Sequence, residues 1–277
     1  MTIKETIQKA YTDRYALGGF NVYNLESAKA VVEAANKKEE PVFAMVSEKS
    51  LDYAGFDELV DLAKNLRSRS KTPVFLHLDH GGSLDIVKKC IKSGFDSVMF
   101  DGSKLPLDQN IQLSKDLRQI AHRNGVFFEA EIGHIGGSED FVSSANFKTN
   151  PAEALMFYSE VKPDMLAVAI GNVHGYDVKN EELDFTLLAK LQDMIKAPLV
   201  LHGCSNRAKR EYQVAIAEGV VKVNIDTELR QAFVEGLHLG LRRRLKDPRE
   251  ILTYASKEIS KSVEEKIDYF TPSPIRK

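Results

Sequence analysis

The sequence predicts a (β/α)₈ barrel followed by additional C-terminal helices. Short apolar runs alternate with longer amphipathic runs, and this unit occurs eight times along the chain. The apolar runs do not alternate cleanly with polar residues, which is typical of parallel strands buried on both faces. Eight strand–helix units are the number that closes such a barrel. The 277 residues suffice for one barrel, so we expect a single domain spanning residues 1–277.

The predicted strands share a short length and a high content of Val, Ile, Leu and Phe. They are Ala16–Tyr23, Pro41–Val46, Pro73–Asp79, Ser97–Gly102, Val126–Gly133, Met165–Gly171, Pro198–Gly203 and Val220–Asp226. The main helices expected between and after them are Glu26–Lys38, Phe56–Arg69, Ser83–Lys92, Leu107–Asn124, a helix from Pro151, Asp184–Ile195, Arg207–Glu218, Thr227–Leu245 and a helix from Pro248. A doubly wound sheet is the alternative, but it usually carries GxGxxG after its first strand, where this chain has "GGFNVYN".

Composition and charge exclude several classes of function. The formal net charge is −2, so nothing in the overall balance indicates binding to nucleic acid, and an anionic substrate needs a local site. No apolar run is long enough to cross a membrane, and the polar, helical N-terminus lacks the apolar stretch of a signal peptide. The two cysteines, Cys90 and Cys204, form no disulfide framework. We therefore expect a cytoplasmic protein without membrane partners.

Polar residues recur where the predicted strands end. They are Asp79 and His80, Asp101, Glu129 and Glu131, His174, His202, and Asn224 and Asp226. In a (β/α)₈ barrel the carboxyl ends of all strands converge on one mouth, where active sites lie. The sequence therefore predicts one polar site at this mouth.

Three histidines stand out at these ends. His80, His174 and His202 each follow an apolar strand and each precede a glycine, which lets the backbone turn sharply. Three imidazoles at one mouth suit a zinc site with an open fourth position, where the metal acts as a Lewis acid. His77 lies inside a strand instead, and we expect it to be a buried, hydrogen-bonded histidine.

Asp79 allows three interpretations beside such a site. It could orient a ligand histidine, bind the metal itself, or act as a general acid and base. Asp79 and His80 start on opposite faces of the strand, so both reach the mouth only if the strand twists at its end. We expect Gly81 and Gly82 to allow that twist.

The segment "VNIDTELR" indicates an anion site. Thr227 could cap the following helix, whose N-terminal N–H groups attract anions, and "HGCS" ends the preceding strand. Together these segments resemble the phosphate site that (β/α)₈ enzymes build after strands seven and eight. An ordinary helix cap at Thr227 remains the alternative.

Several segments carry a family resemblance: "LHLDHGGS", "SVMFDGS", "EAEIGHIGGSED", "AVAIGNVHG", "PLVLHGCS" and "KVNIDTELR". They resemble the signature segments of class II, zinc-dependent fructose-bisphosphate aldolases and their tagatose-bisphosphate relatives, in order along nearly the whole chain. The resemblance implies a lyase that cleaves a ketose (bis)phosphate to dihydroxyacetone phosphate and an aldehyde. It further implies one catalytic Zn²⁺ per chain, a monovalent cation (Na⁺ or K⁺) near the phosphate, and a homodimer or homotetramer.

The resemblance also assigns roles to individual residues. His80, His174 and His202 match the zinc ligands, and Asp79 matches the aspartate that moves a proton on the aldehyde-side hydroxyl. Asp101 and Glu131 match carboxylates that hold the metal in an alternative position. The residues that match the site for the dihydroxyacetone phosphate half are Gly175, Gly203, Cys204, Ser205, Asn224, Ile225, Asp226 and Thr227.

Three segments differ from the usual family pattern. "HGYDVK" stands in place of HGxYK, and "HGCSN" in place of HGGSG or HGGTG. In "DPREILTYASK", Thr253 and Ser256 stand where many relatives carry a cation for the distal phosphate, and Arg249 or Lys257 could compensate. The ketose therefore stays open among fructose 1,6-bisphosphate, tagatose bisphosphate, a deoxy-ketogluconate phosphate and another phosphorylated ketose.

Two further classes of function compete with the aldolase. A metal-dependent hydrolase or isomerase could use the same barrel, but a hydrolase often has two metals, and "GGFNVYN" offers no HxH pair at the first strand. A non-catalytic binding protein could also keep the barrel. The presence of Asp79 with all three histidines argues against that class.

Overall fold

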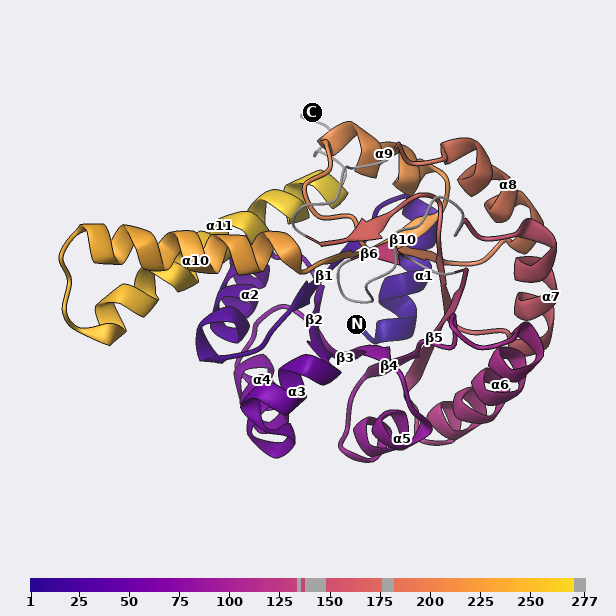
Figure 1. Cartoon of the computed structure of the whole chain (residues 1–277), viewed down its shortest axis with the longest axis horizontal. Coiled ribbons are helices and arrows are strands. Elements are labelled where there is room, and N and C mark those ends of the chain that lie inside the picture. The colour runs from indigo at the N-terminus through magenta and orange to yellow at the C-terminus, as the bar shows by residue number, and fades with distance from the viewer. Residues whose placement is uncertain (134–135, 138–147, 176–181, 272–277) are drawn as a thin grey trace.

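The computed structural model describes residues 1–133, 136–137, 148–175 and 182–271, and these residues form a closed parallel barrel ringed by helices (Figure 1). The barrel strands in chain order are β1 (Leu17–Asn21), β2 (Val42–Ser47), β3 (Val74–Gly81), β4 (Ser97–Phe100), β5 (Phe127–Ile132), β7 (Met165–Val168), β9 (Leu199–Leu201) and β10 (Val220–Ile225). β10 pairs with β1 and closes the barrel. The predicted fold class is confirmed.

The helices follow the strands as expected, with one addition. They are α1 (Ile3–Asp13), α2 (Leu25–Lys38), α3 (Glu48–Ala54), α4 (Phe56–Ser68), α5 (Leu84–Lys92), α6 (Leu107–Arg123), α7 (Pro151–Val161), α8 (Phe185–Ile195), α9 (Lys209–Ala217), α10 (Thr227–Arg242) and α11 (Pro248–Phe270). The short helix α3 was not predicted, because its seven residues show too little periodicity. Ser47 ends β2 and caps α3, and α3 begins at the mouth of the barrel.

The amino-terminal end of the barrel is closed by α1. Ile7 and Ala10 of this helix are buried against interior side chains of several strands, including Leu17, Phe43 and Val200. Figure 1 shows α1 lying within the ring of strands. This apolar plug keeps solvent out of the lower half of the barrel, so access is from the carboxyl-terminal mouth.

The two last helices form an arm. α10 and α11 pack against each other and extend away from the barrel (Figure 1). A Cβ at Gly236 of α10 would lie 2.4 Å from Cα of Ala255 in α11, so the glycine lets the two helix backbones approach closely. None of the described helices is long and apolar enough to span a membrane.

Candidate metal centre

A cavity of about 500 Å³ opens at the carboxyl-terminal mouth of the barrel. Most of the predicted site residues line it: Asp79, His80, Asp101, Glu131, His174, Gly175, His202, Gly203, Ser205, Asn224, Asp226 and Thr227. Cys204 and Ile225 do not line it, since both side chains are fully buried behind the wall. Residues far apart in the sequence thus meet in one site, because the carboxyl ends of all the strands lie at the same end of the barrel.

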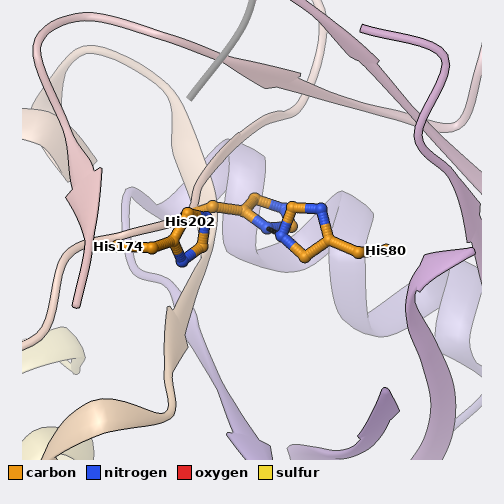
Figure 2. Close-up of side chains that lie close together, drawn as sticks. All are labelled: His80, His174 and His202. Carbon is orange, nitrogen blue, oxygen red and sulfur yellow. Dashed lines mark hydrogen bonds between the residues drawn. The ribbon is translucent and has the colours of Figure 1, made fainter. Parts of the chain in front are cut away.

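The rings of His80, His174 and His202 converge in this cavity (Figure 2). One nitrogen of each ring can be chosen so that all three lie within 4.8 Å of one another, and Nε2 of His80 lies 2.9 Å from Nδ1 of His202. A tetrahedral zinc ion with Zn–N bonds of ~2.0–2.1 Å separates its nitrogen ligands by about 3.3 Å. The donor set and its spacing therefore fit a metal ion held by three imidazoles.

Two of these rings are oriented by carboxylates. Nδ1 of His80 lies 2.9 Å from Oδ2 of Asp101, and Nε2 of His202 lies 2.8 Å from Oε1 of Glu129. A carboxylate accepts hydrogen bonds, so each ring carries a hydrogen on that nitrogen. The opposite nitrogen of each ring is the one that faces the other histidine. This is the arrangement by which outer carboxylates fix metal-binding histidines.

His174 comes from outside the barrel wall. It ends β8 (Val173–His174), which pairs with β6 (Gly136–Gly137) in a small two-stranded sheet. Val173 also donates its N–H to the carbonyl oxygen of Gly203, 3.3 Å away. These contacts attach the third histidine to the loop that follows β9.

The twist that brings Asp79 and His80 to the same cavity lies at His80 itself. His80 has φ 47°, a left-handed backbone conformation that is uncommon for a residue with a side chain. Our assignment of this twist to Gly81 and Gly82 was therefore wrong. Gly81 instead serves close packing, because a Cβ there would lie 2.6 Å from the carbonyl oxygen of Met99.

Asp79 is held by two amides. Nδ2 of Asn21 donates to Oδ2 at 2.8 Å, and Nδ2 of Asn224 donates to Oδ1 at 3.0 Å. Burial by itself would raise the pKa of Asp79, but the neighbouring charges, chiefly those of His80 and His202, outweigh it and lower the pKa. Asp79 is thus a fixed carboxylate beside the histidines. Asn21 was not predicted as a site residue, although it is the last residue of β1 and the predicted site residues also lie at strand ends.

A second group of possible ligands adjoins the first. His80, Asp101 and Glu131 also bring three ligand atoms within 4.8 Å of one another. Oε2 of Glu131 is buried and has no hydrogen-bond partner among the described residues, and burial together with Asp101 raises the pKa of Glu131 well above its usual range. These features are consistent with the alternative metal position implied by the family resemblance.

The opposite wall of the cavity is formed by the ends of β9 and β10. Asp226 occupies the N-cap of α10 and makes no side-chain cap bond, while Thr227 is the first helical residue, so the predicted Thr227 cap is not formed. The N–H groups of Leu229 and Arg230 donate to the carbonyl oxygen of Asp226, and Asp226 and Thr227 line the cavity. Asn206 adopts φ 61°, a conformation that asparagine tolerates better than most residues, so "HGCSN" keeps a backbone for which glycine is usual.

The sequence matches the family model described as "Fructose-bisphosphate aldolase class-II" over residues 1–273. The chain belongs to the class II fructose-bisphosphate aldolase family. It is therefore a metal-dependent lyase, and the barrel described above is the scaffold for its reaction.

Relatives of similar length support the assignment. A fructose-bisphosphate aldolase of Mycoplasma genitalium is 40% identical over 280 residues, covering 97% of this chain and 96% of that protein. A fructose-bisphosphate aldolase of Streptococcus pneumoniae is 39% identical over 286 residues, covering 98% of this chain and 97% of that protein. Since coverage is nearly complete on both sides, this aldolase matches these relatives from end to end.

Solved structures agree with the fold. The YdjI aldolase from Escherichia coli K12 superimposes with a TM-score of 0.88 at 28% identity, with full coverage of both chains. A protein described as a putative fructose-1,6-bisphosphate aldolase from Coccidioides immitis gives a TM-score of 0.87 at 28% identity, covering 97% of this chain and 95% of that one.

The segments that depart from the family pattern have different positions in this aldolase. Most of "HGYDVK", residues 176–179, lies outside the described residues. Arg249 pairs with Asp247, and Lys257 lies over the ring of Tyr254. Within the described part of one chain, no residue of α11 lines the cavity. Among the residues that the structure describes, the cations at its rim are Lys49, after β2, and Lys104, after β4.

Proposed function

We propose that this aldolase cleaves a ketose bisphosphate, with fructose 1,6-bisphosphate as the first candidate, to dihydroxyacetone phosphate and an aldehyde phosphate. The proposal rests on one observation, the meeting of the three imidazoles with the doubly held carboxylate of Asp79 in one cavity. We propose Zn²⁺ as the metal, bound by His80, His174 and His202. When bound, it supplies a Lewis acid beside the ketone group of the substrate.

The chain's own residues then bind the substrate and move the proton. We place the phosphate of the three-carbon half against the N-terminus of α10 and the Gly203–Ser205 turn, whose residues Thr227, Gly203 and Ser205 line the cavity. Asp79 takes the proton from the hydroxyl on the carbon that becomes the aldehyde, and returns it during condensation. Asn21 and Asn224 occupy one lone pair on each carboxylate oxygen, so they fix the orientation in which Asp79 meets that hydroxyl.

The distal half of the substrate is directed toward the rim lysines. Asp79 and His80 lie near the end of β3, which pairs with β2 and β4, and these two strands precede Lys49 and Lys104. The carbon chain of a substrate that extends from the metal past Asp79 therefore runs toward two lysines, and this supports a phosphate on the aldehyde half.

A retro-aldol assay of zinc-loaded enzyme against fructose and tagatose bisphosphates, a deoxy-ketogluconate phosphate and ketose monophosphates tests the proposal. Absence of dihydroxyacetone phosphate with every substrate contradicts it.

We further propose a monovalent cation near the phosphate, a homodimer or homotetramer, and a cytoplasmic location. Exposed Val234 and Leu241 on α10 support self-association of the arm, and the two free, buried cysteines support a reducing compartment. Comparing activity in Na⁺, K⁺ and choline salts tests the cation. Light scattering of the purified enzyme tests the oligomer.

A further inference from the structure

The interior of the barrel below the metal centre contains a charged group that the proposed reaction does not use. Lys222 of β10 is fully buried, and its Nζ lies 2.8 Å from Oε2 of Glu129. The other oxygen of Glu129 accepts from Nε2 of His202. A lysine is rarely buried this deeply unless it is paired, and here its partner is also in direct contact with a metal-binding histidine.

Lys222 has a second partner on the far side of the barrel. Its Nζ lies 3.2 Å from Nε2 of His77, and Nδ1 of His77 lies 2.9 Å from Oγ of Ser97. Because an ammonium group only donates, Nε2 of His77 accepts and Nδ1 carries the hydrogen. The residues Ser97, His77, Lys222, Glu129 and His202 thus form one buried network, which we call the interior network. It confirms the expectation that His77 is buried and hydrogen-bonded.

Each bond of the interior network has a fixed direction. Lys222 donates to Glu129, and Glu129, as a carboxylate, accepts from His202 as well. His202 therefore carries its hydrogen on Nε2, and its Nδ1 keeps a lone pair toward the cavity. Nδ2 of Asn224, 3.2 Å from that Nδ1, is a donor and is compatible with the same tautomer.

The fold makes room for this arrangement. A Cβ at Gly19 would lie 3.3 Å from Cε of Lys222 and 2.9 Å from Oδ1 of Asn224. Glycine at this position of β1 leaves the space in which both side chains cross the barrel. The position of Lys222 is therefore built into the neighbouring strand.

We propose that Lys222 is a positioning residue that, through Glu129, holds His202 in the tautomer able to bind the metal through Nδ1. This inference rests on the proposed metal site and adds to it a residue that touches neither metal nor substrate. It makes an unusual demand on Glu129, which must present an acceptor on both oxygens at once.

Substitution of Glu129 by glutamine tests that demand. Gln has one acceptor and one donor end, and Lys222 will draw the carbonyl oxygen toward itself. The amide NH₂ of Glu129→Gln then faces Nε2 of His202 and forces the hydrogen onto Nδ1, the metal-binding atom. We expect Zn²⁺ affinity, measured by chelator competition, to fall by about 100-fold, the upper end of the effect of outer partners.

The double variant Glu129→Gln/Lys222→Met gives the opposite expectation. With the lysine removed, Gln can turn its carbonyl oxygen toward His202 and restore the Nε2–H tautomer. Zn²⁺ affinity should recover at least about tenfold over the single variant, although a second native residue has been lost. Long-range ¹⁵N–¹H spectra of metal-free protein should show His202 as Nε2–H in the parent, Nδ1–H in Glu129→Gln, and Nε2–H again in the double variant.

A matched control is available on α11. Lys266 is also buried and lies 2.9 Å from a carboxylate, that of Glu228, away from the three rings. Lys266→Met should lower thermal stability without changing Zn²⁺ affinity or the His202 spectrum. A double variant that binds Zn²⁺ no better than Glu129→Gln, or a parent His202 protonated on Nδ1, overturns the inference. A parent that binds no Zn²⁺ contradicts the proposed function instead, so the two failures are distinguishable.

Discussion

Nε2 of His80 and Nδ1 of His202 lie 2.9 Å apart, and they are 122 residues apart in the sequence. Only one hydrogen can occupy the space between them. Because His202 carries its hydrogen on the opposite nitrogen, the shared hydrogen belongs to His80. The same two atoms are the proposed metal ligands, so a metal ion and this hydrogen compete for one position.

The first prediction concerns proton release on metal binding. Burial would lower the pKa of His80, but the charges of Asp79 and Asp101 outweigh it and raise the pKa well above 6.5, whereas burial and the charge of His80 keep that of His202 well below. At pH 7 the metal-free protein therefore holds a charged His80 and a neutral His202. Binding Zn²⁺ should release about one proton from this pair, and Zn²⁺ affinity should rise with pH until it passes the pKa of His80.

Calorimetry in buffers of different ionisation enthalpy measures this release. The expected proton count falls toward zero at a pH above the pKa of His80, where the ring is already neutral. Zinc binding at pH 7 without any buffer-dependent heat would contradict the protonation states assigned here.

The second prediction separates proton transfer from metal binding. Asp79→Asn keeps the size of the side chain and removes the base, so kcat should fall by about 10²–10⁴-fold, the usual contribution of a general base. Zinc content should remain near the parental value, because Asp79 is not one of the three imidazole ligands. Metal analysis and steady-state kinetics on the same preparation check both halves. Equal loss of zinc and of activity would instead make Asp79 a metal ligand.

The third prediction concerns the packing of β3 against β4. Gly81→Ala places a Cβ 2.6 Å from the carbonyl oxygen of Met99, a backbone atom that cannot move alone. The free energy of unfolding should fall by about 1–3 kcal/mol, as for other overpacked sites. Gly82→Ala is the control, since its Cβ would meet only Oε1 of Glu48 at 3.4 Å. Denaturant unfolding of both metal-free variants checks the difference, and equal stability of the two refutes it.

The fourth prediction concerns the distal end of the substrate. Lys49→Ala and Lys104→Ala each remove a rim cation, so the KM for a ketose bisphosphate should rise several-fold, while that for a monophosphate lacking the distal group should change little. An exposed lysine of α8, Lys190, gives the control substitution. If both substrates respond alike, the rim lysines act on the whole cavity and do not select the distal phosphate.

The sequence predicted the barrel because eight buried strands leave an unmistakable pattern of short apolar runs. It also predicted the three histidines, whose position before glycine at strand ends is a local signal. It did not predict the left-handed backbone of His80, because the close contact of Gly81 with Met99 in β4 is a tertiary feature that spacing along the chain does not show. Local glycine preference pointed to the wrong residue.

The interior network was also missed, although its signal was present. Lys222 stands in the middle of the apolar run "VVKVNI", where a buried cation requires a partner. Glu129 was noted only as a polar residue at a strand end. Spacing along one chain cannot pair the two, since their contact depends on the register of strands that are not consecutive. For the same reason the sequence did not show that Asn21 of β1 contacts Asp79 of β3, since this pairing also depends on the register of the strands.

The two amides that hold Asp79 come from either side of the β1–β10 seam. Asn21 ends β1 near the start of the chain, and Asn224 lies in β10, which is made last among the barrel strands. A ribosome-bound chain that lacks β10 has Asn21, Asp79 and His202 but not Asn224. The nascent protein can therefore acquire an oriented base only when the barrel closes, and a truncated chain is left without activity. Asp79 can therefore be held by both amides only after β1 and β10 have both been synthesised and paired.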